Sequence, residues 1–178
     1  MCQHKEKPLL EIGEVKMIDL VVEAVKKSSV EEFYVAVSPN TFKTKIYCQE
    51  KGFKIIETSG KNYHADIAFL LKLYPVFVSL PSDTPLLKCD DIDDLMMAYT
   101  KKSITGCVCV DSLPEGITPS HTFECGGKTY TAIGVNVVID SENSEIFVFD
   151  NPLLGINVNT PEELEIARKY FLNSTKAG

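Results

Sequence analysis

Strand-like apolar stretches alternate with stretches of helical periodicity along this chain, and this alternation constrains its fold more than any other feature. Residues 17–27 carry apolar side chains at the spacing of one helix face. Residues 75–80, Pro-Val-Phe-Val-Ser-Leu, are apolar almost without interruption, as in a strand that is buried on both faces of a parallel sheet. Strands and helices in this order predict an α/β fold with a doubly wound, mostly parallel sheet of Rossmann-like type.

The remaining elements follow from the same periodicity and from turn and cap signals. Residues 111–130 are rich in Pro, Gly, Ser and Thr, which predicts a loop with room for a hairpin. Thr160, Pro161 and Glu163 fit the N-cap, the first position and the capping box of a final helix. The expected strands span residues 33–37, 54–57, 75–80, 105–110, 131–139 and 145–149. The expected helices span residues 17–27, 41–50, 64–73, 92–101 and 161–171.

The composition restricts the partners and the location of the protein. Its 178 residues are 44% hydrophobic and 24% charged, which is ordinary for a globular chain, and we expect one domain over residues 1–178. A net charge of -7, without a dense run of Lys or Arg, argues against nucleic acid as the main partner. No apolar stretch approaches the ~20 residues that span a bilayer, and no apolar signal region opens the chain. We therefore expect a cytoplasmic protein without a membrane partner.

Six cysteines are present, and an even number can indicate disulfide bonds in a short secreted chain. This chain has no export signal and is long enough to form a core, which favours reduced cysteines. Cys107 and Cys109 alternate within an apolar run and are expected to share one face of a core strand. A zinc site is the alternative, although the sequence contains no C-x-x-C pair.

Three polar clusters follow predicted strands, at residues 38–41, 58–61 and 82–83. In a doubly wound sheet, ligands bind outside the carboxyl ends of the strands. We therefore expect these clusters to meet at one edge of the sheet and to form a site for a small molecule.

Asp83 is the first candidate for chemistry, because it follows the apolar run at residues 75–80 and lies between two prolines. A carboxylate at that place can hold Mg²⁺, which prefers oxygen ligands and substrate phosphates. The alternative is an Asp that only caps the next turn. The amide oxygen of Asn159 can likewise reach a metal or a nucleotide, or can serve only the N-terminus of the last helix.

The other candidates are weaker when each is taken alone. Gly60 and Lys61 offer close backbone approach and a point charge to a phosphate, or form a plain surface turn. Lys7 indicates only a solvated side chain before a short strand. Asn136 interrupts an apolar strand and needs a hydrogen-bond partner if it is buried. No His-Ser or His-Cys pair can be read from the sequence, so nucleophilic catalysis by a side chain has little support.

Several strings of residues occur together in this chain and carry a family resemblance. They are Glu6–Leu9 (E-K-P-L), Ser38–Thr41 followed by residues 43–45 (S-P-N-T-x-K-T-K), Thr58–Asp66 (T-S-G-K-x-Y-x-x-D), Ser82–Asp83 (S-D), Gly134–Val138 (G-x-N-V-V) and Asn157–Thr160 (N-x-N-T). The set resembles the nucleotidyltransferases of nucleotide-diphospho-sugar transferase fold. It is most similar to their archaeal GTP:adenosylcobinamide-phosphate guanylyltransferase branch, over nearly the whole chain. The S-D and N-x-N-T strings are shared with the molybdenum-cofactor guanylyltransferases.

The resemblance implies a guanylyltransferase that moves GMP from GTP to adenosylcobinamide phosphate, releases pyrophosphate and uses Mg²⁺, in cobalamin biosynthesis. It implies that Lys7 and Asp83 act in catalysis, Lys7 by supplying charge to the phosphates. Asp83 and Asn159 would hold Mg²⁺, and the loop at residues 59–60 would contact guanine or ribose with support from Asp66. The implied nucleotide-binding residues are Ser38, Asn40, Thr58, Ser59, Gly60, Lys61 and Asp66.

The chain departs from the family at its beginning. The family opens with a buried strand and a glycine-rich phosphate loop just before E-K-P-L, whereas Met1 falls where that loop should end. We therefore expect the first, central strand to be missing, with a gap of roughly 9 to 10 Å between its former neighbours. We also expect the gene to encode a longer product. Asn62 stands where the family has a Gly.

Two alternatives to corrinoid guanylyl transfer remain open at this point. One is guanylyl transfer to molybdopterin, and the other is a non-catalytic nucleotide or corrinoid binder that has lost its phosphate loop. A homodimer is considered as the assembly of the chain.

Overall fold

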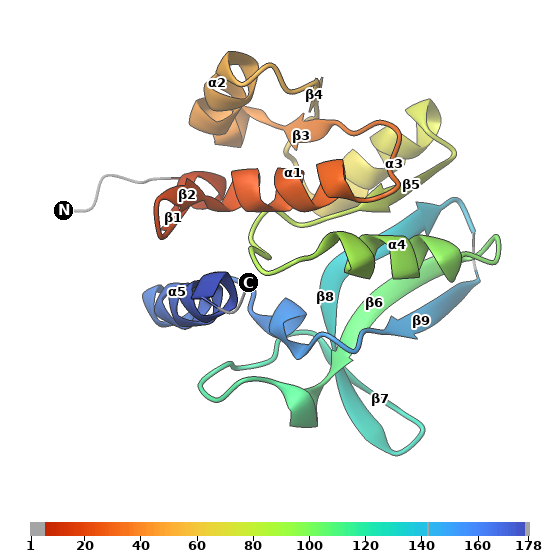
Figure 1. The fold of residues 1–178 in the computed structure, drawn as a ribbon. Coiled ribbons are helices and arrows are strands. Elements are labelled where there is room, and N and C mark those ends of the chain that lie inside the picture. Colours follow the sequence, from red (N-terminus) through yellow and green to blue (C-terminus); the bar gives the residue numbers. More distant parts are fainter. Residues whose placement is uncertain (1–5, 142, 177–178) are drawn as a thin grey trace.

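The computed structural model of the protein describes residues 6–141 and 143–176, and Figure 1 shows helices around separate groups of strands. The α-helices are α1 (Met17–Lys27), α2 (Phe42–Glu50), α3 (Tyr63–Leu73), α4 (Cys89–Met97) and α5 (Pro161–Lys176). The strands are β1 (Glu11–Ile12), β2 (Val15–Lys16), β3 (Val35–Val37), β4 (Ile55–Glu57), β5 (Val76–Ser79), β6 (Ser103–Cys109), β7 (Thr122–Cys125), β8 (Lys128–Ile139) and β9 (Ser144–Val148). Single 3-10 turns lie at Lys7–Leu9, Pro39–Thr41, Val110–Ser112 and Pro152–Gly155.

The largest sheet is mixed. Its strand order is β5-β8-β6-β9, and β7 pairs with the first part of β8. β8 runs antiparallel to β5 and β6, whereas β6 and β9 are parallel. The expected α/β fold is confirmed, but the sheet is not mostly parallel. The reason is the β7–β8 hairpin, because a tight turn at Gly126 and Gly127 reverses the chain where a helical crossover would have kept its direction.

The sheet is interrupted between β3 and β5. β3 and β4 form a parallel pair of their own, and β5 is paired only with β8. Tyr34 and Tyr74 lie just before β3 and β5, and their ring centroids are 5.6 Å apart, so the two strands start close together. Within the described residues, no ladder of backbone hydrogen bonds joins β3 to β5. The gap of roughly 9 to 10 Å that an absent central strand would leave stays a prediction.

α1 and α4 pack on one face of the large sheet, as Figure 1 shows. The helix expected at residues 17–27 is confirmed, and its buried residues Val21 and Val25 share a core with Ile92 and Leu95 of α4. A second buried cluster joins β1, the segment before α5 and α5 itself. α3, by contrast, contains no buried residue although it is apolar. None of the helices in the described part of the chain combines the length and apolar content needed to cross a membrane.

α4 begins at Cys89, earlier than the periodicity predicts. The carboxylate of Asp91 accepts hydrogen bonds from the backbone N–H of Lys88 at 2.8 Å and from the amide of Asn151 at 2.9 Å. A side chain in the first turn that reaches back to the N-cap N–H fixes the start of a helix. Asp91 therefore fixes the start of α4.

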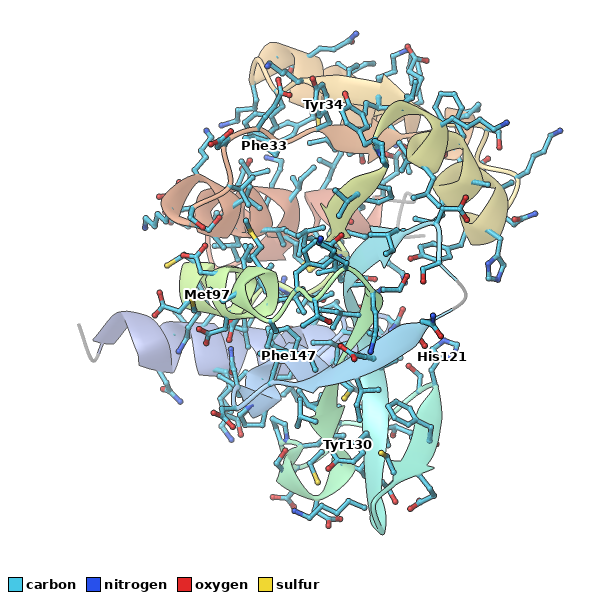
Figure 2. All side chains as sticks on the ribbon, turned by 90° about the vertical axis from the view of Figure 1, so that its right-hand side faces the viewer. Phe33, Tyr34, Met97, His121, Tyr130 and Phe147 are labelled. Carbon is cyan, nitrogen blue, oxygen red and sulfur yellow. The ribbon has the colours of Figure 1, made fainter. Side chains whose placement is uncertain are left out.

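Asn136 has the hydrogen bond that its place in an apolar strand requires. Its Oδ1 accepts from the backbone N–H of Gly106 at 3.2 Å, where the pairing of β6 and β8 is irregular. On the same strand as Gly106, Cys107 is buried, and this burial raises the pKa of its thiol to about 11. Cys107 and Cys109 are both free thiols, as expected. Figure 2 shows Tyr130, in the hairpin at the far end of β8, well away from Tyr34 beside β3.

Candidate active site

Asp83 lies in the loop after β5, and this loop is fixed to the segment before α5. The backbone N–H of Val158 donates to the carbonyl oxygen of Asp83 at 3.0 Å. This contact brings Asn157 and Asn159 to Asp83 from a distant part of the sequence, and Lys7 reaches the same point from the N-terminal segment. We call Lys7, Asp83, Asn157 and Asn159 the Asp83 cluster. It brings together the three residues that were expected to serve catalysis and the metal.

The carboxylate of Asp83 is held by its neighbours. The amide nitrogen of Asn157 donates to Oδ1 at 2.7 Å and to Oδ2 at 3.0 Å, in the amide orientation that gives both groups a partner. The Nζ of Lys7 lies 3.9 Å from Oδ2. Only 20% of the Asp83 side chain is exposed, and this burial raises its pKa, although the charge of Lys7 acts in the opposite direction. A cation placed beside this partly buried carboxylate would stabilise its ionised form.

Asn159 presents its amide oxygen to Lys7. Its Oδ1 accepts from Nζ at 2.5 Å, and its Nδ2 donates to the carbonyl oxygen of Asn157 at 3.1 Å, which defines the orientation of the amide. Its backbone N–H donates to Oε2 of Glu163 at 2.7 Å. Glu163 and Thr160 form the expected capping box, which is confirmed. These bonds leave the Asn159 side chain little freedom to turn away.

The Asp83 cluster offers two kinds of oxygen atom to a cation: the carboxylate oxygens of Asp83 and the amide oxygen of Asn159. Oxygen ligands of this kind fit Mg²⁺, which takes its remaining ligands from water and substrate phosphates. The ammonium of Lys7 already lies against both residues, so the place attracts a cation. Within residues 6–141 and 143–176, no three His, Cys, Asp or Glu side chains are grouped to hold a metal. A metal bound here would depend on ligands that arrive with the substrate.

A second group of polar residues joins the loops after β3 and β4. The carboxylate of Asp66 accepts from Oγ of Ser59 at 2.8 Å and from the backbone N–H of Gly60 at 3.2 Å. The amide of Asn40 donates to the carbonyl oxygen of Gly60 at 3.2 Å. The hydrogen bond from Ser59 holds the pKa of Asp66 below its usual value. We call Ser38, Asn40, Ser59, Gly60 and Asp66 the Gly60 cluster.

Gly60 fits this cluster because it has no side chain. Its φ is +63°, and a Cβ built on it would lie 2.7 Å from the Cβ of Ser38. We expect Gly60→Ala to lower the free energy of unfolding by more than the ~1 to 2 kcal/mol that left-handed backbone alone costs. Scanning calorimetry should show a midpoint lowered by about 2 to 4 °C for each kcal/mol.

Gly52→Ala is the matched control for this variant. Gly52 has a φ of +70° and no atom within 4 Å of a built Cβ, so the substitution carries the backbone cost without the clash. Equal losses of stability in the two variants would contradict the close approach of Ser38 to Gly60.

The other residues of the loop after β4 have local roles. The backbone N–H of Thr58 donates to the carbonyl oxygen of Val37 at 2.8 Å, which extends the pairing of β3 and β4. The side chain of Lys61 is exposed and, among the described residues, makes no hydrogen bond or ion pair with the Gly60 cluster, although the backbone N–H of Lys61 donates to Oγ of Ser59 at 3.3 Å. Asn62 caps α3, because its Oδ1 accepts from the backbone N–H of Ala65 at 2.9 Å. Asn62, which stands where the family has a Gly, is therefore the N-cap of α3.

Glu6 and Lys7 link the start of α2 to the Asp83 cluster. At the start of α2, the carboxylate of Glu6 accepts from the backbone N–H groups of Lys43 at 2.9 Å and Thr44 at 2.8 Å, and from the Thr44 hydroxyl at 2.6 Å. Burial acts to raise the pKa of Glu6, but these hydrogen bonds outweigh it and the pKa is lowered. Glu6 and Asn157 were not among the predicted site residues. Both lie within the matched strings E-K-P-L and N-x-N-T, which was the signal that could have identified them.

A hollow of about 230 Å³ lies beside the Asp83 cluster and shares Asn157 and Asn159 with it. The hydroxyl-bearing residues Thr118, Ser120 and Thr131 also line it. Glu163 adds a carboxylate, so this lining suits uncharged groups that donate and accept hydrogen bonds better than it suits anions. A hollow of about 270 Å³ lies at the opposite, amino ends of β3 and β4, away from both clusters.

Comparisons with known sequences identify the family of the chain. The model of the MobA-like NTP transferase domain matches residues 1–125. The adenosylcobinamide-phosphate guanylyltransferase of Methanocaldococcus jannaschii is 32% identical to this chain over 174 residues, which cover 91% of this chain and 87% of the relative.

Solved structures show the same fold at low sequence identity. A CMP:2-keto-3-deoxy-manno-octonic acid synthetase complexed with CTP has a TM-score of 0.68 at 15% identity, over 97% of this chain and 94% of that chain. A nucleotidyl transferase from Methanothermobacter has a TM-score of 0.58 at 14% identity, over 94% of this chain and 86% of that chain. The fold, the matched domain and the sequence relative agree, and the chain belongs to the MobA-like family of nucleotidyltransferases.

Proposed function

We propose that this chain is a single-domain cytoplasmic guanylyltransferase that moves GMP from GTP to adenosylcobinamide phosphate in cobalamin biosynthesis, with release of pyrophosphate. The observation that carries the proposal is the Asp83 cluster, in which an ammonium, a carboxylate and an amide oxygen meet in the loop after β5. The Methanocaldococcus jannaschii relative supports it, since its name states guanylyl transfer to this acceptor and it aligns with 91% of the chain.

The residues of the Asp83 cluster supply position and charge for the transfer. The acceptor phosphate is ionised at neutral pH, so its oxygen can attack the α-phosphorus of GTP without a general base. The bond from the α-phosphorus to the bridging oxygen of the β-phosphate breaks, and pyrophosphate leaves. Lys7 neutralises phosphate charge, while Asp83 and Asn159 would hold Mg²⁺, which supplies further charge neutralisation at the same phosphates.

The Gly60 cluster supplies the other half of the nucleotide site in this proposal. Ser38, Asn40, Ser59 and the backbone of Gly60 present donors and acceptors between the loops after β3 and β4. The carboxylate of Asp66, on α3, holds the loop after β4 through its hydrogen bonds from Ser59 and Gly60. Such an array can recognise the edge of guanine or the ribose hydroxyls, because the loop is already fixed before the nucleotide binds.

The acceptor is proposed to approach from the hollow beside Asn157 and Asn159. No residue of the Gly60 cluster lines this hollow. Its hydroxyl and amide groups can form hydrogen bonds with the carboxamide groups that surround a corrinoid ring. Guanylyl transfer to molybdopterin is the second candidate, because the S-D and N-x-N-T strings occur in that branch of the family as well.

Product analysis separates these activities. The full chain is incubated with Mg²⁺, with GTP or ATP, and with adenosylcobinamide phosphate or molybdopterin, and the products are identified by mass spectrometry. We expect a product only with adenosylcobinamide phosphate as the acceptor, and a preference for GTP over ATP of about tenfold or more, since one unpaired polar group costs ~1 to 3 kcal/mol. A product from molybdopterin alone would replace the proposed acceptor. Equal use of GTP and ATP would contradict the guanylyl assignment.

A further inference from the structure

Lys7 occupies the position between the two residues that are proposed to hold Mg²⁺. Its Nζ lies 2.5 Å from Oδ1 of Asn159 and 3.9 Å from Oδ2 of Asp83. The ammonium therefore interacts with the same oxygen atoms that a metal would use.

We propose that Lys7 acts as a built-in cation, which closes the metal site to free Mg²⁺ until nucleotide phosphates draw the ammonium away. The inference rests on the proposed metal role of Asp83 and Asn159. It adds an order of events: the metal enters together with the triphosphate and does not precede it.

The charges around Lys7 favour this arrangement. Asp83 is largely buried, and Glu163 adds a second negative charge nearby, so the cluster requires a cation in the absence of a ligand. A divalent ion and an ammonium a few ångströms apart repel each other in a site that is partly shielded from water. Free Mg²⁺ must therefore displace Lys7 without giving it another anionic partner. A triphosphate supplies that partner, and its negative charges exceed the charge of the one carboxylate that Lys7 leaves.

The structure also allows Lys7 to move without a change in the backbone. The Lys7–Leu9 segment is a 3-10 turn, in which the backbone N–H of Leu10 donates to the carbonyl oxygen of Lys7 at 3.0 Å. Glu6 is tied to the start of α2 by three hydrogen bonds. The side chain of Lys7 is about half exposed, at 49%, and its four-carbon stem can turn towards a phosphate while its base stays fixed.

Metal binding in the absence of nucleotide tests the inference. Mn²⁺ is titrated into the full chain, and the free ion is followed by electron paramagnetic resonance. We expect Lys7→Met to bind Mn²⁺ more tightly than the parent chain, on the order of tenfold, because the competing charge is gone. Lys27→Met removes the same charge from an exposed position on α1, where Lys27 pairs only with Glu23 at 3.1 Å, and should leave Mn²⁺ affinity unchanged.

GTP binding supplies the second readout. Titration calorimetry of GTP with saturating Mg²⁺ should show weaker binding in Lys7→Met than in the parent chain, so that the substitution changes the two affinities in opposite directions. A merely structural role of Lys7 would weaken both. Mn²⁺ affinity in Lys7→Met that equals or falls below that of the parent chain would overturn the inference.

Asp83→Asn separates this inference from the proposed function. Loss of Mn²⁺ binding in Asp83→Asn, combined with unchanged Mn²⁺ binding in Lys7→Met, would overturn the role of Lys7 alone. Mn²⁺ binding of Lys7→Met that survives the added substitution Asp83→Asn would overturn the proposed metal site, and the inference with it.

Discussion

Asp83→Asn should lower the turnover of GTP by a factor on the order of a thousand, because it removes the carboxylate proposed to hold the cation beside the phosphates. The substitution keeps the shape of the side chain, and Asn157 can still donate to its remaining oxygen. Stopped assays of pyrophosphate release, with saturating GTP, Mg²⁺ and acceptor, measure the effect on turnover.

The stability of this variant should not fall. Burial raises the pKa of Asp83 above its value in the unfolded chain, so the folded state binds the carboxyl proton more tightly than the unfolded state. At neutral pH the ionised side chain therefore opposes folding, and a neutral Asn removes that cost. Asp94→Asn, an exposed acid on α4, is the control with the same change of charge and should keep both activity and stability. Turnover of Asp83→Asn close to that of the parent chain would remove Asp83 from the metal site.

An N-terminal extension that places an apolar strand between β3 and β5 should raise the thermal midpoint of the protein and its affinity for GTP. β3 and β5 each have one edge without a strand partner in the described part of the chain. If a strand inserted there forms about four hydrogen bonds at ~1 kcal/mol each, the midpoint should rise by roughly 8 to 16 °C. A glycine-rich loop after that strand would add backbone N–H groups for the triphosphate.

The experiment compares two extensions of equal length. One carries an apolar strand and a glycine-rich loop, taken from the in-frame DNA before the Met1 codon if it encodes them, and the other is a flexible Gly-Ser segment. Scanning calorimetry and GTP titration should respond to the first extension and not to the second. Equal responses, or turnover of GTP by the 178-residue chain that no extension improves, would show that the interruption is not a vacant strand position.

The sequence predicted the elements whose signals are local. The limits of α1 follow from its own periodicity, and the start of α5 follows from Thr160 and Glu163, which contact each other within one turn. The direction of β8 was not predictable in this way, because periodicity gives the faces of a strand and not its orientation. Gly126 and Gly127 marked the reversal, but they only allowed a hairpin and did not require one.

The candidate site was harder to predict than the helices, because its contacts join distant parts of the chain. Position alone left the role of Asp83 undecided, and Lys7 alone indicated nothing, because their partners lie in distant parts of the chain. The family resemblance named both residues, and the structure brings them together with Asn159. Asn157 was missed, since its bond to Asp83 depends on tertiary packing of the segment before α5 against the loop after β5.

Glu6 and Lys7 are consecutive residues, so in the proposed function their peptide bond would link the loops proposed to recognise the base to the proposed phosphate site. Glu6 is held by the start of α2, which directly follows Ser38 and Asn40, whereas Lys7 lies in the Asp83 cluster. A base that fits poorly between the loops would shift the start of α2 and, through Glu6, the backbone from which the Lys7 side chain extends. The free energy of this coupling acts in both directions. Discrimination between nucleotides should consequently appear in the rate of the chemical step as well as in affinity, so a wrong nucleotide that binds would still react slowly.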